Sequence, residues 1–177
     1  AFESSIDEIT KSLKESMSSD LLMKNSPFYL PYLTGERTPL NDPHVRASFH
    51  NMGIETNRSA LVYSLIEGIS FALFDNYQAL SKTGIKLNNL FVIGGGSKNE
   101  DWIKLLASIL DRDLAITEAS DAMAAYGAAR LAYLGYNNLK YEDVLSPPSV
   151  KKFIEKDNSM SPILQDRFAK WKNYYVK

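Results

Sequence analysis

The sequence contains no cysteine among its 177 residues. This absence excludes a disulfide framework and a zinc site built on thiolates, and it is typical of a cytoplasmic protein. An excess of charge of one sign is also lacking, because 20 Lys and Arg residues are matched by 21 Asp and Glu residues, for a formal net charge of -1. We therefore expect neither a nucleic acid nor a membrane surface as the partner.

Long apolar runs are missing as well, and no stretch approaches the roughly 20 apolar residues of a membrane-spanning helix. The chain begins Ala1-Phe2-Glu3, without Met and without a signal peptide, so we expect a piece of something longer. The residues that are present, 45% of them apolar and 23% charged, are typical of a soluble globular protein. The length is sufficient for one domain with a sizeable core.

The most informative stretch runs from Leu90 to Asp101. An apolar run at 90–93 favours a buried strand, and three glycines follow at 94–96. Glycine permits backbone angles that are closed to other residues and leaves no side chain between the backbone and a ligand. Asn99 is a good helix cap, and apolar residues recur at helical spacing after it. The pattern predicts strand, glycine turn and helix, where α/β proteins often bind a nucleotide.

Two better-known nucleotide motifs do not fit this turn. A P-loop requires a Lys followed by Ser or Thr after its last glycine, and a dinucleotide fingerprint requires a glycine where Asn99 stands. The predicted helix opens with Glu100 and Asp101, whose carboxylates would repel a triphosphate placed there. An uncharged adenosine fits this helix end better than phosphates do. The alternative is a tight structural turn that binds nothing.

Hydrophobic periodicity and turn residues predict the other elements. The predicted helices cover residues 6–17, 57–81, 102–110, 121–135 and 161–175, and the predicted strands cover 28–33, 47–52, 90–93, 114–116 and 150–154. The segments 34–43 and 138–148 are predicted loops. The residues expected to end the first helix are Ser16, Ser18, Ser19 and Asp20, and for the helix 121–135 we expect Asp121 as the cap and Gly135 as the end. The alternation of strand and helix after residue 90 favours an α/β fold.

The long predicted helix 57–81 carries an apolar stripe that we expect to be buried, formed by Leu61, Leu65, Ile69, Leu73 and Leu80. Gly68 lies inside this helix, and Gly127 lies inside the helix predicted at 121–135. We expect both glycines to serve close packing, since glycine in a helix interior costs about 1 kcal/mol against alanine.

Catalytic constellations are sparse. The two histidines, His44 and His50, lie near the polar loop, and a structural or exposed role is the favoured interpretation for both. Glu36, Asp42 and Glu67 are candidate bases, and nothing in the sequence singles one out. No Ser-His-Asp set can be assigned from spacing, and no metal site is predicted.

Several blocks together resemble the C-terminal half of the FGGY carbohydrate kinases, and within them the xylulokinases. The blocks are Tyr29-Leu30-Pro31-Tyr32-Leu33-Thr34-Gly35-Glu36-Arg37-Thr38-Pro39 with Asp42-Pro43 and Arg46, then Glu67-Gly68-Ile69-Ser70-Phe71-Ala72-Leu73, then Gly94-Gly95-Gly96-Ser97 with Trp102, then Tyr126-Gly127-Ala128-Ala129-Arg130-Leu131-Ala132. They stand in family order and at family-like spacing across roughly residues 28–135.

The resemblance implies an actin-like, ribonuclease-H-like α/β fold with two lobes around a cleft. Residues 1–177 would form most of the C-terminal, nucleotide-binding lobe, and the N-terminal lobe would lie outside this chain. In such kinases the glycine turn receives the adenosine of ATP, which implies binding by Gly94, Gly95, Gly96, Ser97 and Asn99. The loop residues Arg37 and Asp42 are expected near the cleft, either bridging to the first lobe or ordering the loop.

The implied activity is the ATP- and Mg²⁺-dependent phosphorylation of a sugar hydroxyl, with D-xylulose converted to D-xylulose 5-phosphate. The catalytic aspartate and most sugar contacts would lie in the first lobe, so this chain alone is expected to be inactive, and Mg²⁺ would be held mainly through the nucleotide and that lobe. A gluconate, ribulose or glycerol kinase is an alternative within the family. A non-catalytic actin-like binding or regulatory module is an alternative from another class. The expected partners are the N-terminal lobe and the sugar, and a homodimer is left open.

Overall fold

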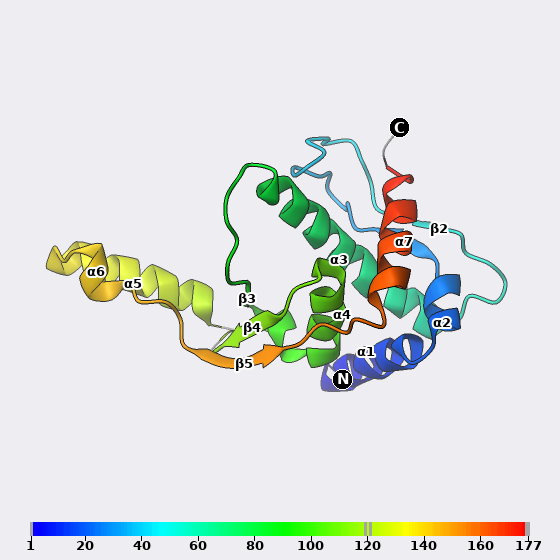
Figure 1. Ribbon diagram of the computed structural model, residues 1–177, viewed down its shortest axis with the longest axis horizontal. Coiled ribbons are helices and arrows are strands. Elements are labelled where there is room, and N and C mark those ends of the chain that lie inside the picture. The colour runs from blue at the N-terminus through cyan, green and yellow to red at the C-terminus, as the bar shows by residue number, and fades with distance from the viewer. Residues whose placement is uncertain (1, 119, 121, 176–177) are drawn as a thin grey trace.

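The computed structural model describes residues 2–118, 120 and 122–175 (Figure 1). The helices are α1 (Phe2–Met17), α2 (Asp20–Asn25), α3 (Arg58–Ser81), α4 (Glu100–Leu110), α5 (Met123–Asn137), α6 (Tyr141–Val144) and α7 (Ser161–Lys172), with a 3-10 turn, η1 (Gly95–Lys98), before α4. The strands are β1 (Phe28–Leu30), β2 (Ser48–His50), β3 (Phe91–Val92), β4 (Leu114–Thr117) and β5 (Val150–Ile154). Within this part of the chain, no helix combines the length and the apolar character that crossing a membrane requires.

Most predicted elements are confirmed, and the two short helices α2 and α6 were missed. Serines at 16, 18 and 19 predicted only the end of the first helix, but Ser19 also caps α2, its side chain accepting a hydrogen bond from the Leu22 N–H. The prediction that Gly135 ends α5 is wrong, because α5 continues to Asn137 and Asn138 adopts the left-handed cap conformation. The predicted cap Asp121 lies outside the described residues.

Two small sheets organise the strands. β1 and β2 pair antiparallel on either side of the loop 31–47. The second sheet has the order β3-β4-β5, in which β3 and β4 are parallel and β5 is antiparallel to β4. Phe91, Ala115 and Phe153 form one row across its three strands. The connection from β3 through α4 to β4 confirms the predicted α/β alternation.

One face of this second sheet is covered by α4. Its apolar side chains pack with the sheet and with the end of α3; the cluster contains Ile103, Leu106, Ala107, Leu110 and Leu114, with Phe74, Tyr77, Leu90, Val92 and Ile154 packed against it. Leu105 and Ile109 on the other side of α4 belong to the main core, so packing on both sides fixes the glycine turn that precedes this helix.

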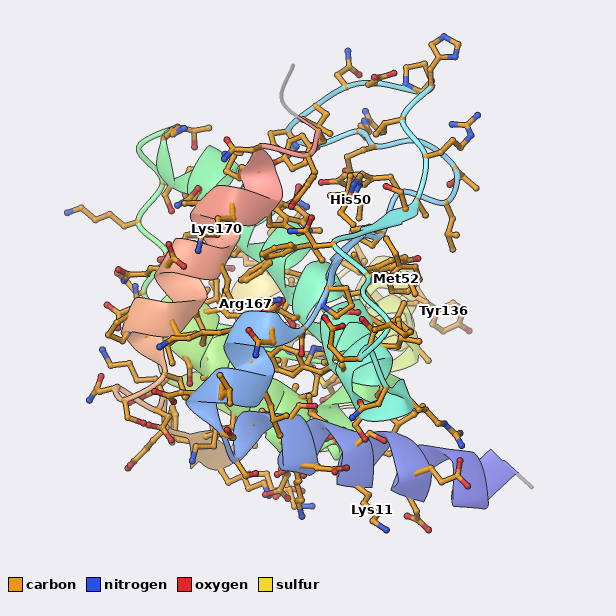
Figure 2. The ribbon with its side chains drawn as sticks, turned by 90° about the vertical axis from the view of Figure 1, so that its right-hand side faces the viewer. Lys11, His50, Met52, Tyr136, Arg167 and Lys170 are labelled. Atoms are coloured by element: carbon orange, nitrogen blue, oxygen red, sulfur yellow. The ribbon has the colours of Figure 1, made fainter. Side chains whose placement is uncertain are left out.

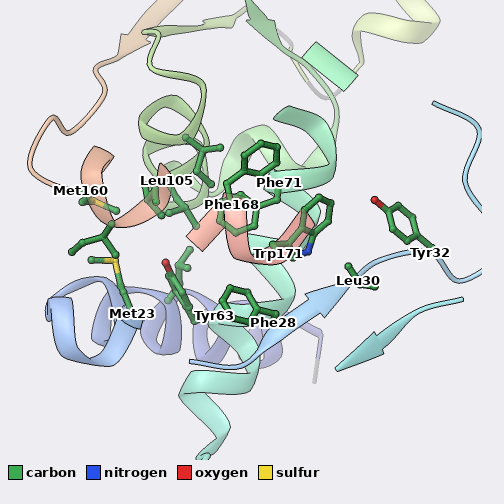
Figure 3. Packing of buried hydrophobic residues seen from close by; sticks show 14 residues of the cluster. Met23, Phe28, Leu30, Tyr32, Tyr63, Phe71, Leu105, Met160, Phe168 and Trp171 are labelled. Atoms are coloured by element: carbon green, nitrogen blue, oxygen red, sulfur yellow. The ribbon is translucent and has the colours of Figure 1, made fainter. Parts of the chain in front are cut away.

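The main core lies where α7 crosses α3, α4 and β1 (Figure 3). Its aromatic centre is built by Phe71 of α3 with Phe168 and Trp171 of α7, whose ring centroids lie 5.4–5.8 Å apart. The Trp171 indole N–H also donates to the Tyr29 carbonyl at 2.7 Å. α7 therefore completes the main core by packing against α3 and β1.

The predicted buried stripe of α3 is wrong. The side of α3 that is fully buried carries Tyr63, Ser64, Glu67, Gly68, Ser70, Phe71 and Asp75. Leu73 and Leu80 are exposed, and the remaining stripe residues are only half-buried. The polar face can be buried because its groups have partners: the Ser70 hydroxyl donates to the Ile66 carbonyl, and the Asp75 carboxylate accepts from Lys172 and Tyr175.

The two helix glycines differ. A Cβ at Gly68 would lie 2.2 Å from the Tyr29 carbonyl oxygen, so close packing of α3 against β1 is confirmed there. A Cβ at Gly127 would meet nothing within 4 Å, so the same prediction is wrong for Gly127. The reason is visible in Figure 1, where α5 and α6 extend away from the rest of the chain, and α5 buries none of its residues.

Candidate functional site

The glycine turn follows β3 and is hydrogen-bonded to the segment just after β4, the strand parallel to β3. Gly94 adopts φ +88°, which favours glycine, and its N–H donates to the Ser120 carbonyl at 2.7 Å, just beyond β4. The Ser97 hydroxyl, which is buried, donates to the Gly94 carbonyl at 2.7 Å and lies 2.6 Å from the Ser120 hydroxyl. Gly94 and Ser97 thus hold the shape of the turn.

The next two glycines have different surroundings. A Cβ at Gly96 would lie 2.8 Å from the Trp102 ring, so Gly96 is required for the turn to rest on the first residues of α4. The Trp102 indole is itself fixed, because its N–H donates to the Ser70 hydroxyl at 2.9 Å. A Cβ at Gly95 would meet nothing within 4 Å. The space above Gly95 is therefore open to a ligand.

Asn99 has the predicted role of helix cap. Its Oδ1 accepts a hydrogen bond from the Trp102 N–H at 3.1 Å. Its Nδ2 donates to the Thr10 hydroxyl of α1, also at 3.1 Å. Lys14 adds an ion pair of 3.5 Å with Asp101, so α1 is attached to the start of α4 at two points.

These residues surround a cavity of about 270 Å³, which we call the glycine-turn hollow. Its lining is formed by Ile9, Thr10, Ile66, Gly95, Gly96, Lys98, Asn99 and Trp102. Apolar side chains of three helices supply the walls, while Thr10 and Asn99 place a hydroxyl and an amide at one side. Concave apolar sites with a few polar groups are typical of small-molecule binding, and this one suits a flat, uncharged ring system.

Some of the predicted binding residues meet in this hollow and others do not. Gly95, Gly96 and Asn99 line it, whereas Gly94 supports the turn from outside the lining. Ser97 borders a second hollow on the β5 side of the turn, together with Thr117 and Ser120. Arg37 and Asp42 line neither hollow.

The loop between β1 and β2 is ordered by its own backbone and by Asp42. The backbone groups of Glu36 and Asp42 exchange hydrogen bonds of 2.9 and 2.8 Å. The Asp42 carboxylate accepts the His44 N–H at 2.7 Å. Arg37 is exposed and lines a cavity within the loop. Asp42 thus orders the loop, and the expected contact of either residue with another lobe stays a prediction.

Among the candidate bases, Glu67 occupies a site unsuited to proton abstraction. Its carboxylate is 1% exposed and forms a bidentate pair with Arg167. Burial, followed by the nearby Glu67 charge, raises the pKa of Tyr63 well above its usual value, so the Tyr63 hydroxyl stays protonated and donates to Glu67 at 2.9 Å. These contacts indicate that Glu67 has a structural role.

The other candidates are also held in local structure. Glu36 accepts the Thr38 N–H at 3.0 Å. His50 stacks on Tyr174 with ring centroids 4.3 Å apart, and His44 is exposed. Among the residues that the structure describes, no group of three or more His, Asp or Glu side chains is placed to hold a metal ion.

Sequence reasoning missed Ile9, Thr10 and Ile66 as lining residues. They come from α1 and α3, which reach the glycine turn only through tertiary packing. The helical periodicity that includes Ile9 was a partial signal, because it indicated that this side of the first helix packs against something. Nothing local pointed to Thr10.

Comparison with known proteins gives a consistent picture. The family model described as the FGGY family of carbohydrate kinases, C-terminal domain, matches residues 2–136. A xylulose kinase of Staphylococcus xylosus is 34% identical over 131 residues, which are 74% of this chain and 27% of that protein. Glycerol kinase 5 of Danio rerio is 30% identical over 151 residues, 84% of this chain and 27% of that protein. The chain thus spans about a quarter of the length of these relatives.

Solved structures agree with the sequence comparisons. The crystal structure of a xylulose kinase from Brucella ovis superposes with a TM-score of 0.77 at 30% identity, covering 96% of this chain and 37% of that one. This similarity confirms the predicted fold class, the actin-like α/β fold of the sugar kinases.

Proposed function

Because the chain belongs to the FGGY family of carbohydrate kinases, we propose that it is the nucleotide-binding part of an ATP-dependent sugar kinase. In this proposal residues 1–177 supply most of the C-terminal lobe, and an N-terminal lobe supplies the catalytic base and most contacts to the sugar. The chain alone would not phosphorylate a sugar.

The glycine-turn hollow is the observation that carries the proposal. Its volume of about 270 Å³ and its apolar walls suit an adenine ring, and the open space above Gly95 leaves the backbone accessible to the ribose. Thr10 and Asn99 offer a hydroxyl and an amide to the edge of the ring. Glu100 and Asp101, at the start of α4, disfavour phosphates at that point, so the phosphate chain would leave the hollow toward the other lobe.

Magnesium would be bound mainly by the phosphates of ATP and by the other lobe. Phosphoryl transfer depends on such a metal ion to offset the charge of the phosphates. This chain contributes by holding the nucleoside in place, so that the γ-phosphate is presented to the sugar hydroxyl in a fixed position.

D-Xylulose is the sugar we propose, because xylulose kinases recur among the relatives at 30% identity and above. Glycerol kinase 5, at 30% identity, keeps glycerol as the alternative that deserves a direct comparison. The whole protein should be assayed with ATP against D-xylulose, glycerol, D-gluconate and D-ribulose. Turnover by residues 1–177 alone, above a blank, would contradict the division of labour proposed here.

The nucleotide site is tested by Gly95→Val in the whole protein. A Cβ at Gly95 would meet no protein atom within 4 Å and the backbone of Gly95 is not left-handed, so we expect the variant to fold. It should lose the rise in melting temperature that saturating ATP causes, because the side chain enters the adenosine space. Gly127→Val, which also points into open space, is the matched control and should keep the full rise.

Two other results are informative. An unchanged ATP-induced shift in a folded Gly95→Val protein would mean that the nucleotide binds elsewhere. A Gly95→Val protein that unfolds without ATP would mean that the turn is tight for structural reasons, and the hollow would lose its assignment.

A further inference from the structure

Two walls of the glycine-turn hollow are linked through one buried hydroxyl group. Ile66 of α3 and Trp102 of α4 both line the hollow. Ser70 follows Ile66 by one turn of α3, is 0% exposed and lies outside the lining. Its hydroxyl donates to the Ile66 carbonyl at 2.7 Å and accepts the Trp102 indole N–H at 2.9 Å. Ser70 therefore joins the two walls without taking part in the surface of the hollow.

The chemistry of these two hydrogen bonds allows only one arrangement of donors and acceptors. A serine hydroxyl has a single proton, and that of Ser70 is donated to the Ile66 carbonyl. The indole N–H of Trp102 can only donate, so it uses a lone pair of the same oxygen. An alanine at position 70 would leave the indole N–H without this acceptor. Because an unpaired donor is costly, the ring would then turn toward water or toward another acceptor.

The position of Ser70 is itself fixed by its neighbours on α3. Glu67 is paired with a buried guanidinium of α7, Gly68 approaches β1 too closely to accept a Cβ, and Phe71 is fully buried in the main core. Protein interiors are close-packed, so this part of α3 cannot shift without disturbing all three contacts. Ser70 thus offers the indole an acceptor that does not move.

The other end of the indole rests against the glycine turn. A Cβ at Gly96 would lie 2.8 Å from Cζ3, an atom of the six-membered ring of Trp102, whereas the nitrogen bound to Ser70 belongs to the five-membered ring. The ring is therefore in contact at both ends. Trp102 is half-buried and lines the hollow, so the part of the ring that stays accessible faces a possible ligand. Aromatic side chains of this kind bind nucleic-acid bases by stacking.

We propose that the Trp102 indole is the platform on which the adenine ring of ATP stacks, and that Ser70 is a positioning residue that holds this platform in place. The inference rests on the proposed function, because it assumes that the hollow receives the adenosine. A ring that is already fixed loses less conformational freedom when the ligand binds, so it binds more tightly than a mobile one. Ser70 thus contributes to nucleotide affinity without touching the nucleotide.

The test compares Ser70→Ala with Ser64→Ala in the whole protein. Ser64 is a matched control, since it is also 0% exposed on α3, and its hydroxyl donates to the carbonyl of Leu61, which does not line the hollow. We expect the dissociation constant for ATP, measured by calorimetry, to rise about three- to tenfold in Ser70→Ala and less than about twofold in Ser64→Ala. The kcat at saturating ATP should change less than about twofold in Ser70→Ala, because the variant impairs binding and not the chemical step.

Trp102→Phe supplies a second measurement that leaves the buried hydroxyl in place. Phenylalanine keeps an aromatic ring in the hollow but has no N–H to donate to Ser70. Ser70→Ala should therefore weaken ATP binding by less than about twofold when it is combined with Trp102→Phe. An equal effect of Ser70→Ala with and without Trp102→Phe would overturn the proposal, since Ser70 would then act through the general stability of α3.

Failure of this inference can be distinguished from failure of the proposed function. If the wild-type protein binds ATP and Ser70→Ala binds it equally tightly, the role of Ser70 is overturned and the nucleotide site stands. Comparable losses of affinity in Ser70→Ala and Ser64→Ala would overturn that role as well. A wild-type protein that does not bind ATP would overturn the proposed function, and the platform role of Trp102 with it.

Discussion

The guanidinium of Arg167 in α7 is bound edge-on to the carboxylate of Glu67 in α3, with both contacts, Nε to Oε1 and Nη2 to Oε2, at 2.6 Å. The other three N–H groups of Arg167 donate to the carbonyls of Lys24, Ser26 and Pro27, so all five donors are satisfied. Burial alone would lower the pKa of Arg167, but the Glu67 charge raises it above its usual value. Figure 2 shows Arg167 directed from α7 into the interior.

Glu67→Gln should lower the free energy of unfolding by about 3–5 kcal/mol, because it leaves the buried guanidinium without a counter-charge. The measurement is urea unfolding at neutral pH. Asp166→Asn is the matched control, since it breaks an exposed pair with Lys170 on the same helix and should cost less than about 1 kcal/mol. Similar losses of unfolding free energy in the two variants would show that the three backbone carbonyls are enough to stabilise the buried Arg167.

Gly68→Ala and Gly127→Ala should have opposite effects on stability. At Gly68 the new methyl would overlap the Tyr29 carbonyl, so α3 and β1 must separate, at a cost on the order of 1–3 kcal/mol or more. At Gly127 the methyl meets open space, and the higher helix propensity of alanine should stabilise α5 by up to about 1 kcal/mol. Thermal unfolding of the two variants provides the comparison. A destabilised Gly127→Ala in the whole protein would mean that α5 packs closely against the upstream part.

Asn99→Ala should destabilise the protein by about 1 kcal/mol, because α4 loses its cap. Asn99→Asp keeps an oxygen for the Trp102 N–H but loses the amide that donates to Thr10. We therefore expect Asn99→Asp to be more stable than Asn99→Ala in chemical unfolding. If both variants unfold at the same denaturant concentration, the loss in Asn99→Ala comes from the link to α1 and the cap contributes little.

Asp157 should make stability depend on pH in the acid range. Hydrogen bonds from Ser159, followed by that from Lys104, hold the pKa of Asp157 below its usual value. Because the folded pKa lies below the unfolded one, the stabilisation is present above about pH 4 and is lost as the pH falls through the folded pKa. Asp157→Asn should therefore lower stability at pH 7, by less than about 1 kcal/mol, and the difference should shrink toward pH 3. Thermal unfolding measures this difference in stability. If it is the same at every pH, the charge of Asp157 is not its cause.

The glycine turn and the helices around it were predictable because their signals are local. Strand, glycine run, cap and apolar spacing all occur between residues 90 and 110, and each constrains the same few backbone angles. Gly95, Gly96 and Asn99 could thus be placed together from sequence. Their role toward a nucleotide stays a prediction.

The buried face of α3 could not be predicted for the opposite reason. Periodicity assigns the interior to leucine, whereas α3 buries Glu67 and Asp75, whose partners Arg167 and Lys172 lie about 100 residues further along. Sequence patterns predict that a charged residue in a helix is exposed, unless the residue that pairs with it is known. Thr10 and Ile66 escaped for the same reason, since their place in the hollow follows from the packing of α1 and α3 on α4.

The position of α7 has a consequence for biosynthesis. Trp171 contacts Tyr29 across 142 residues of sequence, and Arg167 contacts Glu67 across 100. A ribosome adds about 5–20 residues per second, so α3 and β1 wait for several seconds before the helix that closes their core has been made. During that interval Phe28, Tyr63 and Phe71 have no α7 to cover them. The nascent chain should therefore expose this apolar surface until α7 emerges.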